Sequence, residues 1–294
     1  MQEDDLRAST NIEDRRGRGG LGGGAATRGL GIGAIVILGL VGWALGIDPR
    51  ILISGAEIVA GGGGSSIQQQ APSQTATPND ESGNFVARIV GETEDVWSQV
   101  LPEQTNRKYE KPVLVLFAGG TQSECGTARS AMGPFYCPLD HKVYLDTAFF
   151  DDMKRRFGGG GKFADAYVIS HEIGHHVQSL LGILEKVQDQ QRSAPDRATA
   201  NALSVRIELM ADCLAGVWAN KMNQRHHNID ENDVRQAINA ATAIGDDRLA
   251  KQSQGYAVPD SFTHGTSEQR VRWLTTGLKS GAVQSCDTFA AQEP

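Results

Sequence analysis

The sequence has no excess of positive charge. Its 28 lysine and arginine residues face 35 aspartate and glutamate residues, which gives a net charge of −7. A protein that holds a phosphate backbone through counterion release needs the opposite sign. The charge therefore argues against nucleic acid as a partner. With 39% hydrophobic residues, the chain is also too apolar for wholesale disorder.

Cysteine is scarce, with four residues in 294. None shows C-x-x-C spacing, which disfavours a zinc site built from cysteines. Four cysteines allow three pairings, and the sequence does not choose among them. We favour Cys125 with Cys137, which closes a short loop, and Cys213 with Cys286, which ties the C-terminus to an earlier helix. The alternative to two disulfides is four reduced cysteines, which would require a domain in the reducing cytosol.

Only one apolar run reaches membrane length. Residues 30–47 contain no charge and no proline. At 1.5 Å per residue, a helix of this length spans about 27 Å, close to the hydrocarbon thickness of a bilayer. The run therefore predicts a transmembrane helix in contact with lipid. A buried core helix does not suit its charged and linker-like flanks, and a cleaved signal peptide has a shorter apolar region.

The arginines around this run predict its orientation. The four arginines nearest before it are Arg15, Arg16, Arg18 and Arg28, and only Arg50 follows it before Arg88. Because positive loops stay inside, we expect a cytoplasmic N-terminus and a domain that is periplasmic or on the cell surface. The expected organisation is a disordered tail over 1–29, the span over 30–47, a flexible linker over 48–82 and one domain over 83–294. Disulfides suit that location.

Periodicity predicts a helix-rich α+β domain with a small sheet near its front. A short strand is expected over 113–118, and two more lie in 134–146. Helices are expected over 85–101, from 162 to about 189, from 195 to about 224, after Asp230 and after His264. Thr266 and Gln269 have capping-box spacing at the start of the last helix.

The informative motif is His171-Glu172-Ile173-Gly174-His175. Positions i and i+4 share one helical face, so the two imidazoles can bind one cation. Imidazole suits zinc, which takes three protein ligands and a water in catalytic sites and lowers the pKa of that water toward about 7. Glu172 is placed to act as general base on the water. The alternative is a pair of core histidines.

A third ligand is needed. The metzincin pattern is absent, because Gln178 and Leu181 stand where it requires glycine and histidine. The next helix offers Glu208 and Asp212, also at i and i+4. We expect Glu208 to be the third ligand and Asp212 to accept a hydrogen bond from a ligating histidine. A solvated acidic face is the alternative, but the surrounding helix is apolar.

Several segments together carry a family resemblance: NIEDRRG at 11–17, the apolar run, GPFYCPLDHKVYLD at 133–146, SHEIGHHVQ at 170–178, ELMADCLAGVW at 208–218 and THGTSEQR at 263–270. With them, nearly the whole chain resembles the bacterial neutral zinc metallopeptidases, which are membrane-anchored proteins of the gluzincin type. The resemblance implies a zincin-like fold with His171, His175 and Glu208 as zinc ligands and Glu172 as catalytic base. It adds little about the substrate.

Three further residues are candidates of lower rank. His264 can hydrogen-bond the tetrahedral oxyanion, as an imidazole does in gluzincins, or can serve as a local cap. Tyr144 is a second candidate for the oxyanion, and its strand, residues 142–146, can pair with an extended peptide. His176 is expected to pack or to support the ligands.

The predicted function is hydrolysis of peptide bonds by a membrane-anchored zinc enzyme. A metal-stabilised scaffold or binding module of the cell envelope, without peptidase activity, is the alternative. Zinc-dependent hydrolysis of a non-peptide amide or ester needs the same ligands, so the motif does not exclude it.

Overall fold

A four-stranded mixed sheet forms one layer of the protein. The computed structural model describes residues 1–17, 78–157 and 160–294, and the sheet order is β1-β2-β6-β5. The strands are β1 (Ile12–Asp14), β2 (Val113–Phe117), β6 (Lys142–Asp146) and β5 (Phe135–Cys137). The first three run parallel, and β5 runs antiparallel to β6. β6 is therefore an inner strand, and β5 forms an edge.

The two faces of this sheet are covered by different parts of the chain. Successive side chains of a strand point to opposite faces, so Leu114 and Leu116 enter the main core while Val115 and Phe117 join a smaller cluster. A hairpin of β3 (Gly120–Ser123) and β4 (Gly126–Arg129) contributes Ala128 to that smaller cluster. The Cys125–Cys137 disulfide ties this hairpin to the edge strand.

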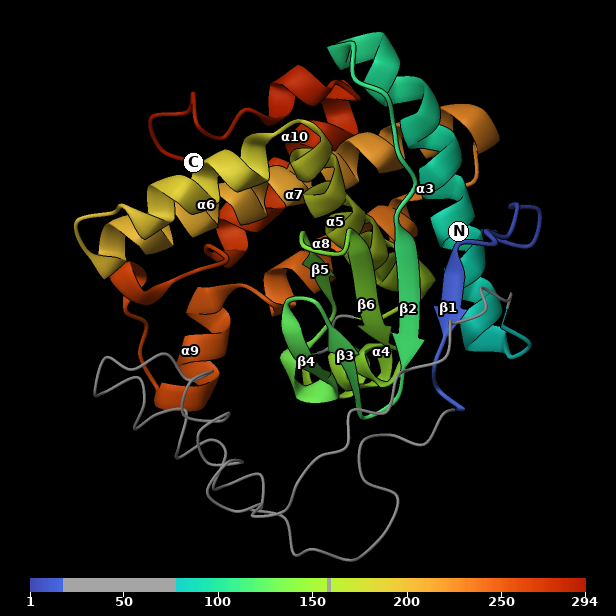
Figure 1. Cartoon of the computed structure of the whole chain (residues 1–294), viewed down its shortest axis with the longest axis horizontal. Coiled ribbons are helices and arrows are strands. Elements are labelled where there is room, and N and C mark those ends of the chain that lie inside the picture. Colours follow the sequence, from blue (N-terminus) through green and yellow to red (C-terminus); the bar gives the residue numbers. More distant parts are fainter. Residues whose placement is uncertain (18–77, 158–159) are drawn as a thin grey trace, which may run out of the picture. The chain divides into compact units, whose positions relative to one another are not determined.

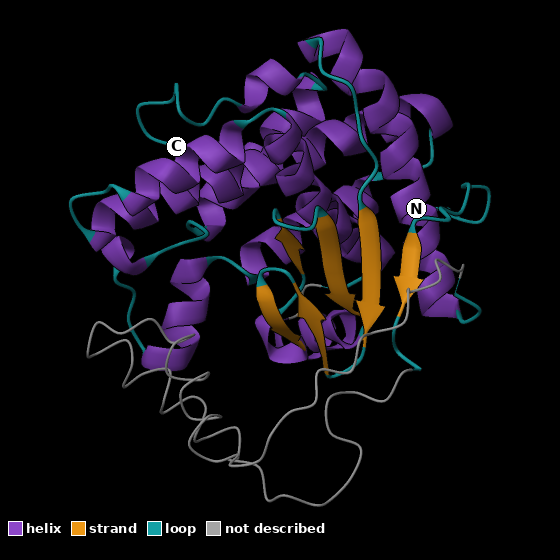
Figure 2. Ribbon diagram, in the orientation of Figure 1, coloured by secondary structure: helices purple, strands orange, loops and turns teal. Residues whose placement is uncertain are grey.

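The helices gather on the other face (Figures 1 and 2). Four of them carry most of the core: α3 (Glu81–Thr105), α5 (Lys162–Leu180), α7 (Arg197–His226) and α10 (Ser267–Ser280). Helices α7 and α10 pack very close together at Gly277, which has no side chain. A Cβ at this position would lie only 1.9 Å from the main-chain oxygen of Cys213 on α7. The Cys213–Cys286 disulfide fastens the C-terminal turn to α7. Both predicted disulfide pairs are thus confirmed.

Shorter helices complete the described domain. They are α4 (Ala148–Asp152), α6 (Ile183–Arg192), α8 (Glu231–Ala243) and α9 (Asp246–Gln254), with a π-helical turn η2 (Met153–Phe157) and the 3-10 turns η1 (Ser130–Met132), η3 (Pro259–Ser261) and η4 (Val283–Cys286). The helix-rich α+β class is confirmed. So is the Thr266–Gln269 capping box of α10.

Two features of the elements differ from the sequence prediction. The expected helix from 162 to about 189 is two helices, because Gly182 adopts a left-handed conformation with φ 71° between α5 and α6. The β3–β4 hairpin and α9 were not predicted.

The prediction of a disordered tail over 1–29 is wrong for residues 1–17. β1 pairs with β2, and Ile12 is fully buried in the main core. The Ser9 N–H also donates to the carbonyl oxygen of Ala87 at 2.8 Å. These residues have little apolar periodicity of their own and fold by pairing with a strand about a hundred positions away.

This pairing also bears on the predicted membrane orientation. Main-chain hydrogen bonds join residues 12–14 to β2, so both must lie on the same side of a membrane. The predicted arrangement, with a cytoplasmic N-terminus and an extracytoplasmic domain, stays a prediction, because the apolar run lies outside the described residues. Two of the counted arginines serve the fold instead: Arg15 pairs with Glu13, and Arg16 with Asp14 and Asp80.

The predicted span at 30–47 lies outside the described residues, as does nearly all of the predicted linker at 48–82. Within residues 1–17, 78–157 and 160–294, no helix has the length and apolar character needed to cross a bilayer.

Candidate metal centre

Three predicted ligands meet between α5 and α7. His171 and His175 lie one turn apart on α5, and Glu208 faces them from α7. One donor atom from each lies within 4.8 Å of the others. The distance from His171 Nε2 to Glu208 Oε2 is 3.1 Å, and the distance from His175 Nε2 to Glu208 Oε1 is 3.6 Å. The three side chains expose 8%, 12% and 19% of their surface, so the cluster is largely shielded from water.

The other ring nitrogen of each histidine is held by a hydrogen bond. His171 Nδ1 donates to Asp212 Oδ1 at 2.9 Å, as the sequence predicted for Asp212. His175 Nδ1 donates to Gln178 Oε1 at 2.9 Å, and the Gln178 amide donates to the carbonyl oxygen of Ile207 at 2.7 Å. These bonds place the protons on Nδ1 and leave both Nε2 atoms free to bind a metal. Gln178 had no such role in the sequence prediction.

Asp212 is the centre of a buried polar network. Its side chain is fully buried and accepts bonds from His171, from the Tyr167 hydroxyl at 2.5 Å and from the guanidinium of Arg270. Burial raises the pKa of Asp212, but the charges of Arg270 and His171 outweigh it and bring the pKa to about 2. Asp212 is therefore ionised at neutral pH.

The geometry fits Zn²⁺. Ligand atoms bound to tetrahedral zinc at about 2.1 Å lie about 3.4 Å from one another. The separations of 3.1 Å and 3.6 Å are close to that value and run to the two different oxygens of Glu208, Oε2 and Oε1. Two nitrogens and one carboxylate oxygen are a donor set of catalytic zinc sites, which leave a fourth position for water. In the metal-free protein, burial lowers the pKa of His171, but Asp212 and Glu208 raise it to about 10. Without a metal, the proton on His171 therefore occupies the position that a zinc ion would take.

Glu172 lies at the same centre. It is 8% exposed and sits next to His171 on α5. Burial raises its pKa, whereas the imidazoles of His171 and His175 act in the opposite direction. A buried carboxylate with a raised pKa suits a general base, which must accept a proton and later release it.

His264 approaches the centre from the loop before α10. Its main-chain N–H donates to Asp246 Oδ2 at 2.6 Å, and its Nδ1 lies 3.3 Å from Asp246 Oδ1. Burial lowers the pKa of His264, but the charges of Glu208 and Asp246 raise it overall, and its side chain is half exposed. Asp246, at the start of α9, was not predicted. It holds the His264 ring by Nδ1 and leaves Nε2 available.

Comparison with known proteins identifies a related family. The family described as "Putative neutral zinc metallopeptidase" matches residues 1–289. The chain belongs to this family. It is 46% identical over 289 residues to the uncharacterized protein YpfJ of Escherichia coli strain K12, covering 96% of each chain. It is 40% identical over 234 residues to the uncharacterized protein Rv2575 of Mycobacterium tuberculosis H37Rv, covering 75% of this chain and 76% of the relative. No solved structure matches it.

His176 packs against residues other than the three candidate ligands, as expected. It is 2% exposed, and its Nε2 donates to the carbonyl oxygen of Glu110 at 2.6 Å. Its Nδ1 then accepts from the Tyr136 hydroxyl of β5 at 3.1 Å, and Tyr136 accepts from His141. This chain of bonds fixes α5 against the edge strand.

The prediction that Tyr144 reaches the site is wrong. Tyr144 lies on the sheet face turned away from the helices, where it stacks on Phe135 and donates to Asp140 at 2.6 Å. The β6 strand that carries it already has neighbours on both sides. It therefore has no free edge for a peptide, whereas β5 is an edge strand of the described sheet.

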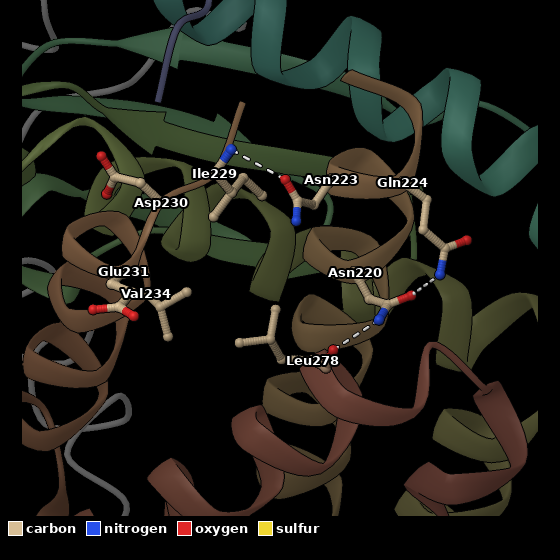
Figure 3. A pocket seen from close by; sticks show the side chains of 8 residues that line it. All are labelled: Asn220, Asn223, Gln224, Ile229, Asp230, Glu231, Val234 and Leu278. Atoms are coloured by element: carbon tan, nitrogen blue, oxygen red, sulfur yellow. Dashed lines mark hydrogen bonds between the residues drawn. The ribbon is translucent and has the colours of Figure 1, made fainter. Parts of the chain in front are cut away.

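A separate hollow lies between α7, α8 and α10 (Figure 3). Its volume is about 410 Å³, and amide, acidic and apolar side chains line it: Asn220, Asn223, Gln224, Ile229, Asp230, Glu231, Val234 and Leu278. It shares none of the candidate ligands. Asp230 is already engaged in the capping box of α8.

Proposed function

We propose that the protein is a zinc-dependent peptidase whose metal is held by His171, His175 and Glu208. The observation that carries the proposal is the meeting of two imidazoles and one carboxylate, with a donor atom of each within 4.8 Å of the others. The Glu172 carboxylate lies beside them. Membership of a zinc metallopeptidase family supports hydrolysis as the reaction class.

Each residue then has a chemical task. Bound zinc supplies Lewis acidity, which polarises a carbonyl and lowers the pKa of water. The Glu172 carboxylate takes a proton from the attacking water and delivers it to the leaving amine. Burial lowers the pKa of His264, but Glu208 and Asp246 raise it overall, so the ring can carry a proton on both nitrogens. Its Nδ1–H then donates to Asp246, and its Nε2–H donates to the oxyanion that develops on the substrate.

The edge strand β5 is the candidate platform for the substrate. Among the described strands it pairs with β6 alone, so its other side has no strand partner. Strand addition on that side is the mode of binding that we propose for an extended peptide. Tyr136 in the middle of β5 is tied to α5 through His176. The strand is therefore fixed relative to the helix that carries both histidine ligands.

The test uses the full chain and an unfolded protein such as casein, with and without a zinc chelator. We expect cleavage that the chelator abolishes. Glu172→Gln should retain zinc and lose turnover, and Glu103→Gln, on an exposed part of α3, is the matched control. A zinc-loaded protein that cleaves no peptide in a broad library would favour the scaffold, or an ester or amide hydrolase if small substrates turn over. Full activity of Glu172→Gln would refute the assigned base.

We also propose that the described domain, with its N-terminal strand, resides in an oxidising compartment. Both cysteine pairs form disulfides, which persist outside the reducing cytosol. Protein trapped in acid and alkylated without reductant should bind no alkylating reagent. Labelling of all four cysteines would contradict this location.

A further inference from the structure

We propose that Arg270 is a positioning residue that fixes the orientation of the ligand His171 by acting through Asp212. The inference rests on the zinc site proposed above. Arg270 lies in the first turn of α10 and is 3% exposed. Its Nε donates to Asp212 Oδ2 at 2.9 Å, and its Nη2 donates to Asp212 Oδ1, also at 2.9 Å.

This two-point contact fixes the plane of the carboxylate. A carboxylate held by one donor can rotate about its terminal bond, whereas a guanidinium fork that binds both oxygens prevents that rotation. Asp212 Oδ1 is the atom that accepts from His171 Nδ1. Because the fork sets the direction of Oδ1, it also sets the angle at which the His171 ring presents Nε2 toward Glu208.

Arg270 also joins several segments around the centre. Its Nη2 lies 3.2 Å from the Tyr167 hydroxyl of α5, and Nη1 donates to the carbonyl oxygen of Ile244 at 3.4 Å. Ile244 stands two residues before Asp246, and Arg270 itself stands six residues after His264. One side chain therefore connects the histidine ligand to the two segments that carry the Asp246–His264 pair.

Charge and geometry predict opposite effects of removing Arg270. The guanidinium is a permanent positive charge near the cation site, so a purely electrostatic role means that its loss tightens zinc binding. A positioning role means that its loss weakens binding, because the His171 ring loses its fixed orientation. Arg270→Lys keeps the charge and removes the fork, so only the positioning role predicts a weaker site for this variant.

The experiment measures zinc affinity of the full chain by competition with a chromogenic chelator. The variants are Arg270→Lys and Arg270→Met, with Arg272→Lys, an exposed arginine on the same helix, as matched control. We expect about tenfold weaker zinc binding for both Arg270 variants, in line with outer contacts of metal ligands, and no change for the control. Unchanged or tighter binding in Arg270→Lys would overturn the proposal.

A double-mutant cycle separates positioning from a general loss of stability. Arg270→Met leaves the buried Asp212 carboxylate without its guanidinium partner and can fail to fold. It is therefore also combined with Asp212→Asn, which removes that charge. If Arg270 acts through Asp212, the double variant binds zinc as weakly as Asp212→Asn alone. Additive losses would refute this route. If the wild-type chain binds no zinc, the proposed function fails; if it binds and the Arg270 variants match it, only this inference fails.

Discussion

The N-terminal strand offers a prediction on which sequence and structure disagree. A disordered tail predicts that Ile12→Ala has no effect on stability, whereas the structure buries Ile12 completely in the main core. The substitution removes three carbon groups, each contributing about 0.8 kcal/mol on burial. The cavity left behind adds to this loss, and core isoleucine-to-alanine changes cost about 2–5 kcal/mol in all. We expect a loss of about 3 kcal/mol in the free energy of unfolding.

The assay is thermal unfolding of the full chain, followed by circular dichroism. A loss of about 3 kcal/mol lowers the melting temperature by about 6–12 °C in a domain of this size. Leu139→Ala is the matched control, since Leu139 is 66% exposed and its truncation should change stability by less than about 0.5 kcal/mol. Equal melting temperatures for the two variants would refute the position of β1 in the sheet.

Three further predictions concern the site and its helix. In the metal-free protein, burial lowers the pKa of His171, but Asp212 and Glu208 raise it to about 10. Because zinc must displace that proton, its apparent affinity should rise by up to about tenfold per pH unit between about pH 6.5 and 10. Equal competition by a chelator at pH 7 and pH 9 would contradict this. Gln178→Leu removes the acceptor of His175 Nδ1 and should weaken zinc binding about tenfold, whereas Gln178→Glu, which keeps an acceptor, should weaken it less in the same assay. Burial raises the pKa of Asp165 to about 7, so the stability that its protonated carboxyl contributes is fully present below about pH 4 and is lost as the pH rises to 7. The melting temperature of Asp165→Asn should therefore increase relative to that of the wild type over this range. A constant difference between the two would argue against burial of Asp165.

Local spacing was sufficient to predict the ligand cluster. The pairs His171–His175 and Glu208–Asp212 each lie one helical turn apart, so a single face of each helix presents both side chains. Two supporting residues also carried a local signal, because Tyr167 precedes His171 by four positions and Gln178 follows His175 by three. Both lie on the ligand-bearing helix and could have been recognised from that spacing.

Arg270 and Asp246 could not be predicted in this way. Their roles depend on how α10 and the start of α9 pack against α5 and α7, which no periodicity in one segment records. The same reason explains the failure at β1. A three-residue strand has no pattern of its own and is defined by its partner β2.

The orientation prediction rests on a count that leaves out tertiary contacts. Counting arginines near an apolar run treats each as a free charge, but Arg15 and Arg16 pair with carboxylates within the fold. Those contacts depend on tertiary structure, which the count ignores.

The central claim is that one metal ion is held between α5 and α7. It is tested most directly by the zinc content of the full chain after dialysis against limiting zinc. We predict one zinc per wild-type chain, retention by Glu103→Ala, whose carboxylate is exposed on α3, and loss of zinc in both His171→Ala and Glu208→Ala. One tightly bound zinc in Glu208→Ala, with wild-type affinity, would contradict the account.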